Sequence, residues 1–125
     1  MRILVIDDDE AWCRLLQQML STLGCRAEYA TSGQKALQTL LKVKIDLVLL
    51  DIHLAEMGSL ELLEQFRKRN ARTPVVVMTS LPDSPLVQKA LRLGARECLA
   101  KPLGFEVLRR ILRCAKSSRK RSEES

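Results

Sequence analysis

The chain has 125 residues, of which 46% are hydrophobic and 29% are charged, as expected for one globular domain. No apolar run approaches the roughly 18 residues of a membrane span, and the first apolar stretch is too short for a signal peptide, which argues against membrane and secreted proteins. The formal net charge is +6, but seven basic residues and no acid lie between Arg109 and Arg121, so the excess belongs to the end of the chain.

Five short runs, most of them rich in apolar residues, predict β-strands. They are Ile3–Ile6, Arg26–Thr31, Leu47–Leu50, Val75–Thr79 and Glu97–Ala100. The first, third and fourth are almost entirely apolar, which is typical of parallel strands covered on both faces. The second and fifth are more polar, so we expect them at the edges of a sheet.

Helical patterns follow each of the five runs. Apolar residues recur at the 3.6-residue spacing of an amphipathic helix, beginning with the stripe from Trp12 to Leu23. Gly24 is expected to end the first helix and Gly94 the fourth. Ser32 is the expected N-cap of the second helix, and the fourth is expected to start at Asp83 or Ser84, just before Pro85.

Strict alternation of strand and helix predicts an α/β fold with a doubly wound, open, parallel sheet. In such sheets ligands bind outside the carboxyl ends of the strands. The residues after about Lys116 are polar and charged, which predicts a frayed end. We therefore expect one domain over residues 1–118 and a disordered basic tail, or the start of a linker, over 119–125.

Side chains with functional chemistry follow four of the predicted strands. They are Asp7, Asp8 and Asp9 after the first, Asp51 after the third, Thr79 at the end of the fourth with Ser80 after it, and Lys101-Pro102 after the fifth. Carboxylates brought together at one edge of the sheet repel each other unless a cation lies among them. A divalent metal with oxygen ligands, most simply Mg²⁺, relieves this repulsion. Together with a lysine and a hydroxyl, these groups predict a pocket for a phosphoryl group held against a carboxylate.

The same segments resemble the receiver domains of two-component signalling over about residues 2–116. The matching segments are Ile3–Asp9, Asp46–Asp51, Val75–Ser80, Leu91–Ala95 and Leu99–Pro102. Their order and spacing agree with that family. The resemblance implies a flavodoxin-like (βα)5 fold with strand order 2-1-3-4-5, in a phosphorylation switch of the chemotaxis-regulator type.

The resemblance also assigns a metal site. Asp8 and Asp51 would bind Mg²⁺, or Mn²⁺ in its place, through their carboxylates. Asp7 would bind mainly through water, and the backbone carbonyl of His53 would complete the protein ligands. The His53 imidazole is not expected to be a ligand.

The resemblance further implies how the phosphoryl group is handled. Asp51 would receive it from a phosphohistidine on a sensor histidine kinase or a phosphotransfer protein, and Thr79 and Lys101 would contact it. The Lys101–Pro102 bond is expected to be cis. The domain would be a signalling switch rather than an enzyme. It would assist its own phosphorylation and slow aspartyl-phosphate hydrolysis, and it would switch the face formed by the fourth helix, the fifth strand and the fifth helix.

Some positions depart from the family pattern. Ala55 replaces the usual Pro, and Gly58-Ser59 replaces an Asp-Gly pair, which predicts a less rigid loop. Cys98 replaces the Tyr or Phe that normally precedes the lysine by three residues, so we expect the switch to depend on Thr79 and the loop after it. Cys98 and the other cysteines have no metal-like spacing, and we expect reduced, mostly buried thiols in a cytoplasmic protein.

Other functions fit the sequence less well. A haloacid-dehalogenase-like phosphatase needs Thr where Ala11 stands, and a cobalamin module needs Gly where Glu56 stands. A receiver-like scaffold that has lost phosphorylation would not need all of the acidic residues Asp7, Asp8 and Asp51, which this chain retains. A homodimer, a stand-alone regulator and a missing effector domain all remain open, whereas contacts with membranes or nucleic acid are not expected.

Overall fold

The computed structural model describes the backbone of residues 1–54, 58–69 and 72–124, and side chains as far as residue 117. Ala55 and Glu56 therefore lie outside the described residues. The described elements, in chain order, are β1 (Arg2–Ile6), α1 (Glu10–Thr22), β2 (Arg26–Ala30), α2 (Gly33–Lys42), β3 (Leu47–Asp51), α3 (Ser59–Arg69), β4 (Val75–Thr79), α4 (Pro85–Arg92), β5 (Glu97–Ala100) and α5 (Phe105–Glu124).

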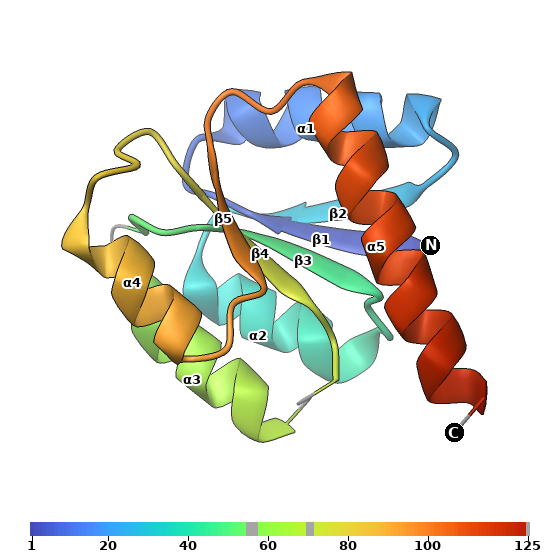
Figure 1. The fold of residues 1–125 in the computed structure, drawn as a ribbon. Coiled ribbons are helices and arrows are strands. Elements are labelled where there is room, and N and C mark those ends of the chain that lie inside the picture. The colour runs from blue at the N-terminus through green and yellow to red at the C-terminus, as the bar shows by residue number, and fades with distance from the viewer. Residues whose placement is uncertain (55–57, 70–71, 125) are drawn as a thin grey trace.

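All strand pairs of the sheet are parallel, and the order is β2-β1-β3-β4-β5 (Figure 1). This confirms the predicted doubly wound α/β fold. The more polar strands β2 and β5 are the two edges, as their composition predicted. Because the strands run in the same direction, the residues that follow β1, β3, β4 and β5 meet at one end of the sheet.

Helices cover both faces of the sheet (Figure 1), and a hydrophobic core cluster lies on each face. Side chains on a strand alternate between its faces, so Ile3 and Val5 pack against α1 and α5, whereas Leu4 and Ile6 pack against the layer of α2, α3 and α4. The central strands β3 and β4 are buried along their whole length. Their carboxyl ends are therefore held rigidly, which is what a site at those ends requires.

The helix boundaries agree with the capping signals in the sequence. The side chains of Asp9, Ser32 and Ser84 accept hydrogen bonds from backbone N–H groups in the first turns of α1, α2 and α4. Gly24 and Gly94 follow α1 and α4 with φ of 84° and 106°, the left-handed conformation that glycine adopts most easily.

The last helix extends into the predicted tail. The backbone of α5 is helical to Glu124, beyond Lys116, where the polar composition predicted a frayed or disordered end. The last described core contact of this helix is Ala115. Lys, Arg and Glu favour helix even without a buried face. The division into residues 1–118 and 119–125 remains a prediction.

The cysteines are free thiols, as expected, but they are less buried than predicted. Cys13 is buried, Cys25 and Cys98 are partly buried, and Cys114 is exposed. None of the helices in the described part of the chain combines the length and hydropathy that crossing a membrane requires.

Candidate functional site

A buried ion pair lies at the carboxyl end of the sheet. The Lys101 Nζ donates to Asp7 Oδ2 at 2.6 Å and lies 3.4 Å from Asp51 Oδ1. Asp7 and Asp51 are 1% and 5% exposed. One ammonium group from the end of β5 therefore faces two buried carboxylates from the ends of β1 and β3.

A third carboxylate completes an acidic cluster. Oxygen atoms of Asp7, Asp8 and Asp51 all lie within 4.8 Å of one another, and Asp8 is the exposed member. The prediction that these residues converge is thus confirmed. Three carboxylates and one lysine leave an excess of negative charge, which fits a divalent cation with oxygen ligands.

The pKa values of the ion pair reflect this crowding. Burial raises the pKa of the Asp7 carboxyl above its usual value, although the hydrogen bond from Lys101 opposes the shift. Burial alone would lower the pKa of Lys101, but its hydrogen bond to Asp7 and the charges of Asp51 and Asp7 outweigh burial and raise it. Lys101 is therefore charged at neutral pH, whereas burial disfavours the charged form of Asp7.

The hydroxyl of Thr79 lies at the end of the neighbouring strand β4. Thr79 is fully buried, and its Oγ1 accepts a hydrogen bond of 2.8 Å from the Leu81 N–H. Its carbonyl accepts a 2.8 Å bond from the Lys101 N–H, which ties the ends of β4 and β5 together. The predicted cis Lys101–Pro102 bond is present. Ser80, also named from the sequence, is exposed.

Comparison with known proteins identifies the family that shares this arrangement. A family profile described as the response regulator receiver domain matches residues 3–113. The chain belongs to this family. Receiver domains are signalling switches that accept a phosphoryl group, and the fold and the buried acidic pocket agree with that general function.

Individual relatives give the same result. The receiver domain is 40% identical over 106 residues to transcriptional regulatory protein ZraR of Klebsiella oxytoca, covering 85% of this chain and 24% of that protein. It is 36% identical over 102 residues to the regulator of RpoS of Escherichia coli K12, covering 82% of this chain and 30% of that protein. The chain thus spans about a quarter of the length of the curated relatives it matches.

Solved structures show the same fold. The crystal structure of a CheY-like response regulator receiver domain protein from Methanospirillum hungatei matches with a TM-score of 0.89 and 27% identity, covering 96% of this chain and 97% of that chain. The signal receiver domain of an HD domain-containing protein from Pseudomonas fluorescens matches with a TM-score of 0.88 and 31% identity, covering 95% and 97%.

One residue of this receiver domain's site was missed in the sequence. Ser59 is buried, and its hydroxyl bonds to the carbonyl of Asp51 and the N–H of Leu54. The Gly58-Ser59 pair had predicted a less rigid loop, whereas the described part of this loop is fastened to the end of β3. The available signal was a hydroxyl where the family has glycine, but spacing alone does not show where that hydroxyl points.

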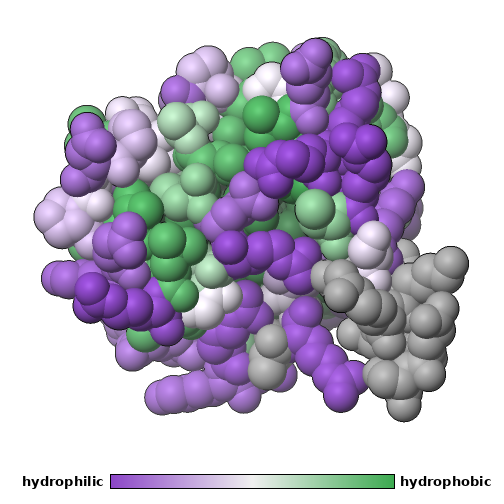
Figure 2. Space-filling model, viewed as in Figure 1, coloured by the Kyte–Doolittle hydropathy of each residue, from purple (hydrophilic) through white to green (hydrophobic). Residues whose placement is uncertain are grey.

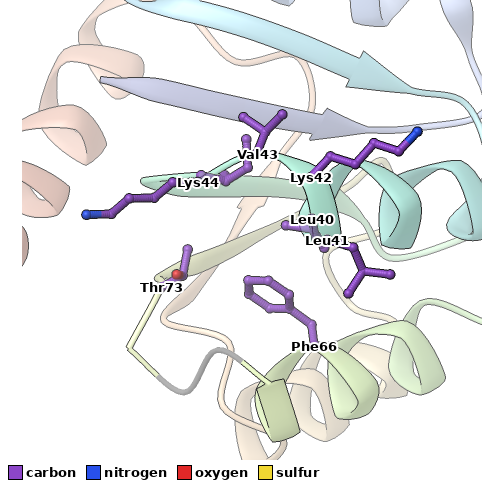
Figure 3. A pocket seen from close by; sticks show the side chains of 8 residues that line it. Leu40, Leu41, Lys42, Val43, Lys44, Phe66 and Thr73 are labelled. Carbon is purple, nitrogen blue, oxygen red and sulfur yellow. The ribbon is translucent and has the colours of Figure 1, made fainter.

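A separate cavity lies far from this chemistry. It has a volume of about 320 Å³ and is lined by residues that include Leu40, Lys42, Lys44, Phe66 and Thr73 (Figure 3). The lining residues before β3 and β4 place it at the amino ends of the strands. It is therefore at the opposite end of the sheet from the acidic cluster and takes no part in the site.

Proposed function

We propose that Asp51 of this receiver domain accepts a phosphoryl group from a phosphohistidine on a sensor histidine kinase or phosphotransfer protein, with Mg²⁺ as cofactor and Mn²⁺ as a substitute. The observation that carries the proposal is the Lys101 ammonium, which bridges Asp7 and Asp51 beside Asp8 at the strand ends. This arrangement supports the proposal, because the Asp51 carboxylate lies beside the positive charge of Lys101.

The proposed step is a direct transfer. A carboxylate oxygen of Asp51 attacks phosphorus, the P–N bond of the phosphohistidine breaks, and its electron pair and a proton remain with the imidazole. Lys101 balances the negative charge of the transferred oxygens, and the Thr79 hydroxyl is the hydrogen-bond donor to one of them. The same residues would serve the slow hydrolysis of the aspartyl phosphate, so the domain is a switch whose signal decays.

The residues present fit a hard divalent cation. The carboxylates of Asp8 and Asp51 and the backbone carbonyl of His53 would hold it directly, and Asp7 would act mainly through water. The His53 N–H donates to Asp51 Oδ1 at 3.2 Å, so this segment already turns around the Asp51 carboxylate. When bound, the ion would neutralise the charge of the phosphoryl oxygens.

Magnesium should stabilise the folded protein through this site. At a concentration one hundred times the Kd, it should add about 2.7 kcal/mol to the free energy of unfolding and raise the Tm by roughly 10 °C. Asp8→Asn should lose most of that rise, while in magnesium-free buffer it should equal or exceed the wild type in stability, because one of three mutually repelling carboxylates is gone. Thermal unfolding with and without magnesium measures both effects.

Asp9→Asn is the matched control for this experiment. It removes the same charge one residue further along, and Asn caps a helix as well as Asp does, so the start of α1 is preserved. It should keep the magnesium response. A full response in Asp8→Asn would contradict the proposed metal site.

We further propose that phosphorylation switches the face formed by α4, β5 and α5. Figure 2 views this side of the molecule, where apolar surface alternates with hydrophilic side chains. Leu91 of α4 and Leu99 of β5 are partly buried apolar residues. On this face Arg110 donates two hydrogen bonds to Glu97, which lowers the pKa of the Glu97 carboxyl. A change transmitted from the site would therefore reach a surface able to bind partners.

The proposed route to this face starts at Thr79. Its hydroxyl accepts the Leu81 N–H, and Leu81 opens the connection that leads to the Ser84 cap of α4. Movement of the Thr79 hydroxyl toward a phosphoryl group would pull on this connection. Cys98 packs against the layer that contains α4, but its side chain has one χ angle and cannot sweep out the path of an aromatic ring.

Two substitutions separate the roles of these residues. Thr79→Ala should still permit phosphorylation but reduce the response of α4, because Leu81 loses its bond to the hydroxyl. Cys98→Ser should leave both nearly unchanged. NMR shift changes at Ala90, Leu91 and Gly94 on addition of beryllofluoride, a phosphoryl mimic, measure the response. Loss of these changes in Cys98→Ser with retention in Thr79→Ala would show that the route is different.

The remaining assignments follow from the relatives. Because the chain covers about a quarter of the matched regulators, we propose that an effector domain receives the signal in a longer protein, with a stand-alone regulator as the alternative. We also propose a cytoplasmic location, where histidine kinases present their phosphohistidine.

A further inference from the structure

The hydroxyl of Ser59 links two points on the segment that follows β3. Ser59 is the first residue of α3 and is 4% exposed. Its Oγ donates to the Asp51 carbonyl at 2.5 Å and accepts from the Leu54 N–H at 3.2 Å. Both bonds are buried, and they join α3 to the segment that carries the proposed phosphoacceptor.

Ser59 follows the N-cap position of α3. The Leu62 N–H donates to the Gly58 carbonyl, which is the first hydrogen bond of the helix, so Gly58 occupies the cap position and Ser59 is the first helical residue. A side chain at Gly58 would meet nothing within 4 Å, so space does not prevent a capping serine at that preceding position. The hydroxyl at Ser59 instead points back to the end of β3.

The Leu54 N–H is coupled to the carbonyl of His53. The two groups belong to one planar peptide unit, and in a trans peptide they point in opposite directions. A hydrogen bond that fixes the N–H therefore fixes the carbonyl as well. The preceding peptide unit is also held, because the His53 N–H donates to Asp51 Oδ1. The His53 backbone is thus anchored on both sides, once by the Asp51 carboxylate and once by Ser59.

We propose that Ser59 is a positioning residue for the metal site, whose hydroxyl sets the direction of the His53 carbonyl. This inference rests on the proposed function, in which that carbonyl is a magnesium ligand. Ser59 itself contacts neither the ion nor the phosphoryl group. Groups that hydrogen-bond to a metal ligand and orient it, without contacting the metal themselves, typically contribute 10- to 100-fold to metal affinity. The sequence of the loop after β3 predicted a less rigid segment, and the two hydrogen bonds of the Ser59 hydroxyl hold its described part in place.

Removal of the hydroxyl should weaken magnesium binding. Ser59→Ala and Ser59→Gly should each raise the Kd for magnesium about tenfold, the lower end of the effect of such groups. Ser59→Thr keeps the hydroxyl and should bind magnesium nearly as well as the wild type. NMR titration with magnesium gives the affinities. In magnesium-free buffer, hydrogen exchange of the Leu54 amide should be faster in Ser59→Ala than in the wild type.

Ser32→Ala is the matched control. It removes the same atom from a serine that also accepts a backbone N–H, in this case that of Lys35 at 3.3 Å at the start of α2. It should lower stability without changing the Kd for magnesium. A tenfold loss confined to the Ser59 variants that lack the hydroxyl supports the inference.

Two contrary results have different meanings. Unchanged magnesium affinity in both Ser59→Ala and Ser59→Gly would overturn the positioning role alone and leave the proposed function intact. Absence of magnesium binding in the wild type would reject the proposed function, and the positioning role with it.

Discussion

Replacing Lys101 with Met should lower the free energy of unfolding by about 3 kcal/mol at pH 7 in magnesium-free buffer. The substitution keeps a long apolar side chain but leaves the carboxylates of Asp7 and Asp51 buried without their cation. Loss of one partner from a buried pair typically costs 3–5 kcal/mol, and the lower end applies because the Lys101 side chain is 20% exposed. The neighbouring Asp8 carboxylate adds to the repulsion.

This loss should depend on pH in a defined direction. The pKa of Asp7 is raised in the folded protein even with Lys101 present, so without the lysine it should rise further. A carboxyl group whose pKa is higher in the folded state favours folding at low pH and opposes it as pH rises through that pKa. The penalty of Lys101→Met should therefore be largest at neutral pH and should shrink as the pH falls toward the raised pKa of Asp7.

Urea unfolding at pH 7 and pH 5 measures this penalty. Lys35→Met is the control, because Lys35 is an exposed lysine on α2 and its replacement should change stability by about 0.5 kcal/mol or less. Added magnesium should stabilise Lys101→Met more than the wild type, since it replaces the missing positive charge. Equal stability of the two lysine variants at pH 7 would mean that Lys101 does not compensate the acidic cluster.

The strands and the two edges of the sheet could be predicted because the relevant signals are local, whereas the full strand order was implied by the resemblance to receiver domains. Continuous apolar runs such as Leu47–Leu50 mark strands that are covered on both faces, and the more polar second and fifth runs are indeed the edges. Capping residues such as Ser32 and Ser84 act on the backbone within a few positions along the chain. These features need no knowledge of distant contacts.

The convergence of the site was also predictable, but its internal contacts were not. Parallel strands place Asp7, Asp51, Thr79 and Lys101 at one end of the sheet whatever their side chains do. Which atoms then pair depends on rotamers. Lys101 was predicted to contact a bound phosphoryl group, a role that remains a proposal, and in the structure its ammonium bonds to Asp7.

Two further features have physical causes. The end of α5 lacks an apolar face, which predicts fraying, but its charged residues favour the helical backbone on their own, and the disordered tail over 119–125 remains a prediction. The hydrogen bonds of Ser59 to Asp51 and Leu54 were missed because they form only when the loop after β3 folds so that the start of α3 lies against the end of β3. A contact of that kind depends on the path of the loop and leaves no periodic pattern.

The hydrogen bonds of the three carboxylates support our proposal that Asp51 is the nucleophile. Asp7 has both oxygens engaged, one by Lys101 and the other by the Asp9 N–H at 3.0 Å. Asp8 is exposed, and the described ion pairs of Lys101 involve Asp7 and Asp51 but not Asp8. Oδ1 of Asp51 accepts the His53 N–H, while Oδ2 accepts no hydrogen bond within the described part of the chain. One oxygen of Asp51 is thus held by the backbone, and we propose that the other attacks the phosphoryl group.

Asp51→Asn should therefore abolish phosphorylation while the fold is retained. The amide keeps the size and shape of the side chain but replaces the nucleophilic carboxylate oxygens with a weak nucleophile. Removal of one buried negative charge should cost little stability in magnesium-free buffer, because Asp7 still pairs with Lys101. Asp9→Asn lies outside the acidic cluster and should be phosphorylated like the wild type, which controls for the loss of a charge.

Intact-mass measurement after incubation with magnesium and acetyl phosphate tests the central claim most directly. The wild type should gain the mass of one phosphoryl group, and Asp51→Asn should gain none. Equal labelling of the two proteins would contradict the assignment of Asp51 as the phosphoacceptor.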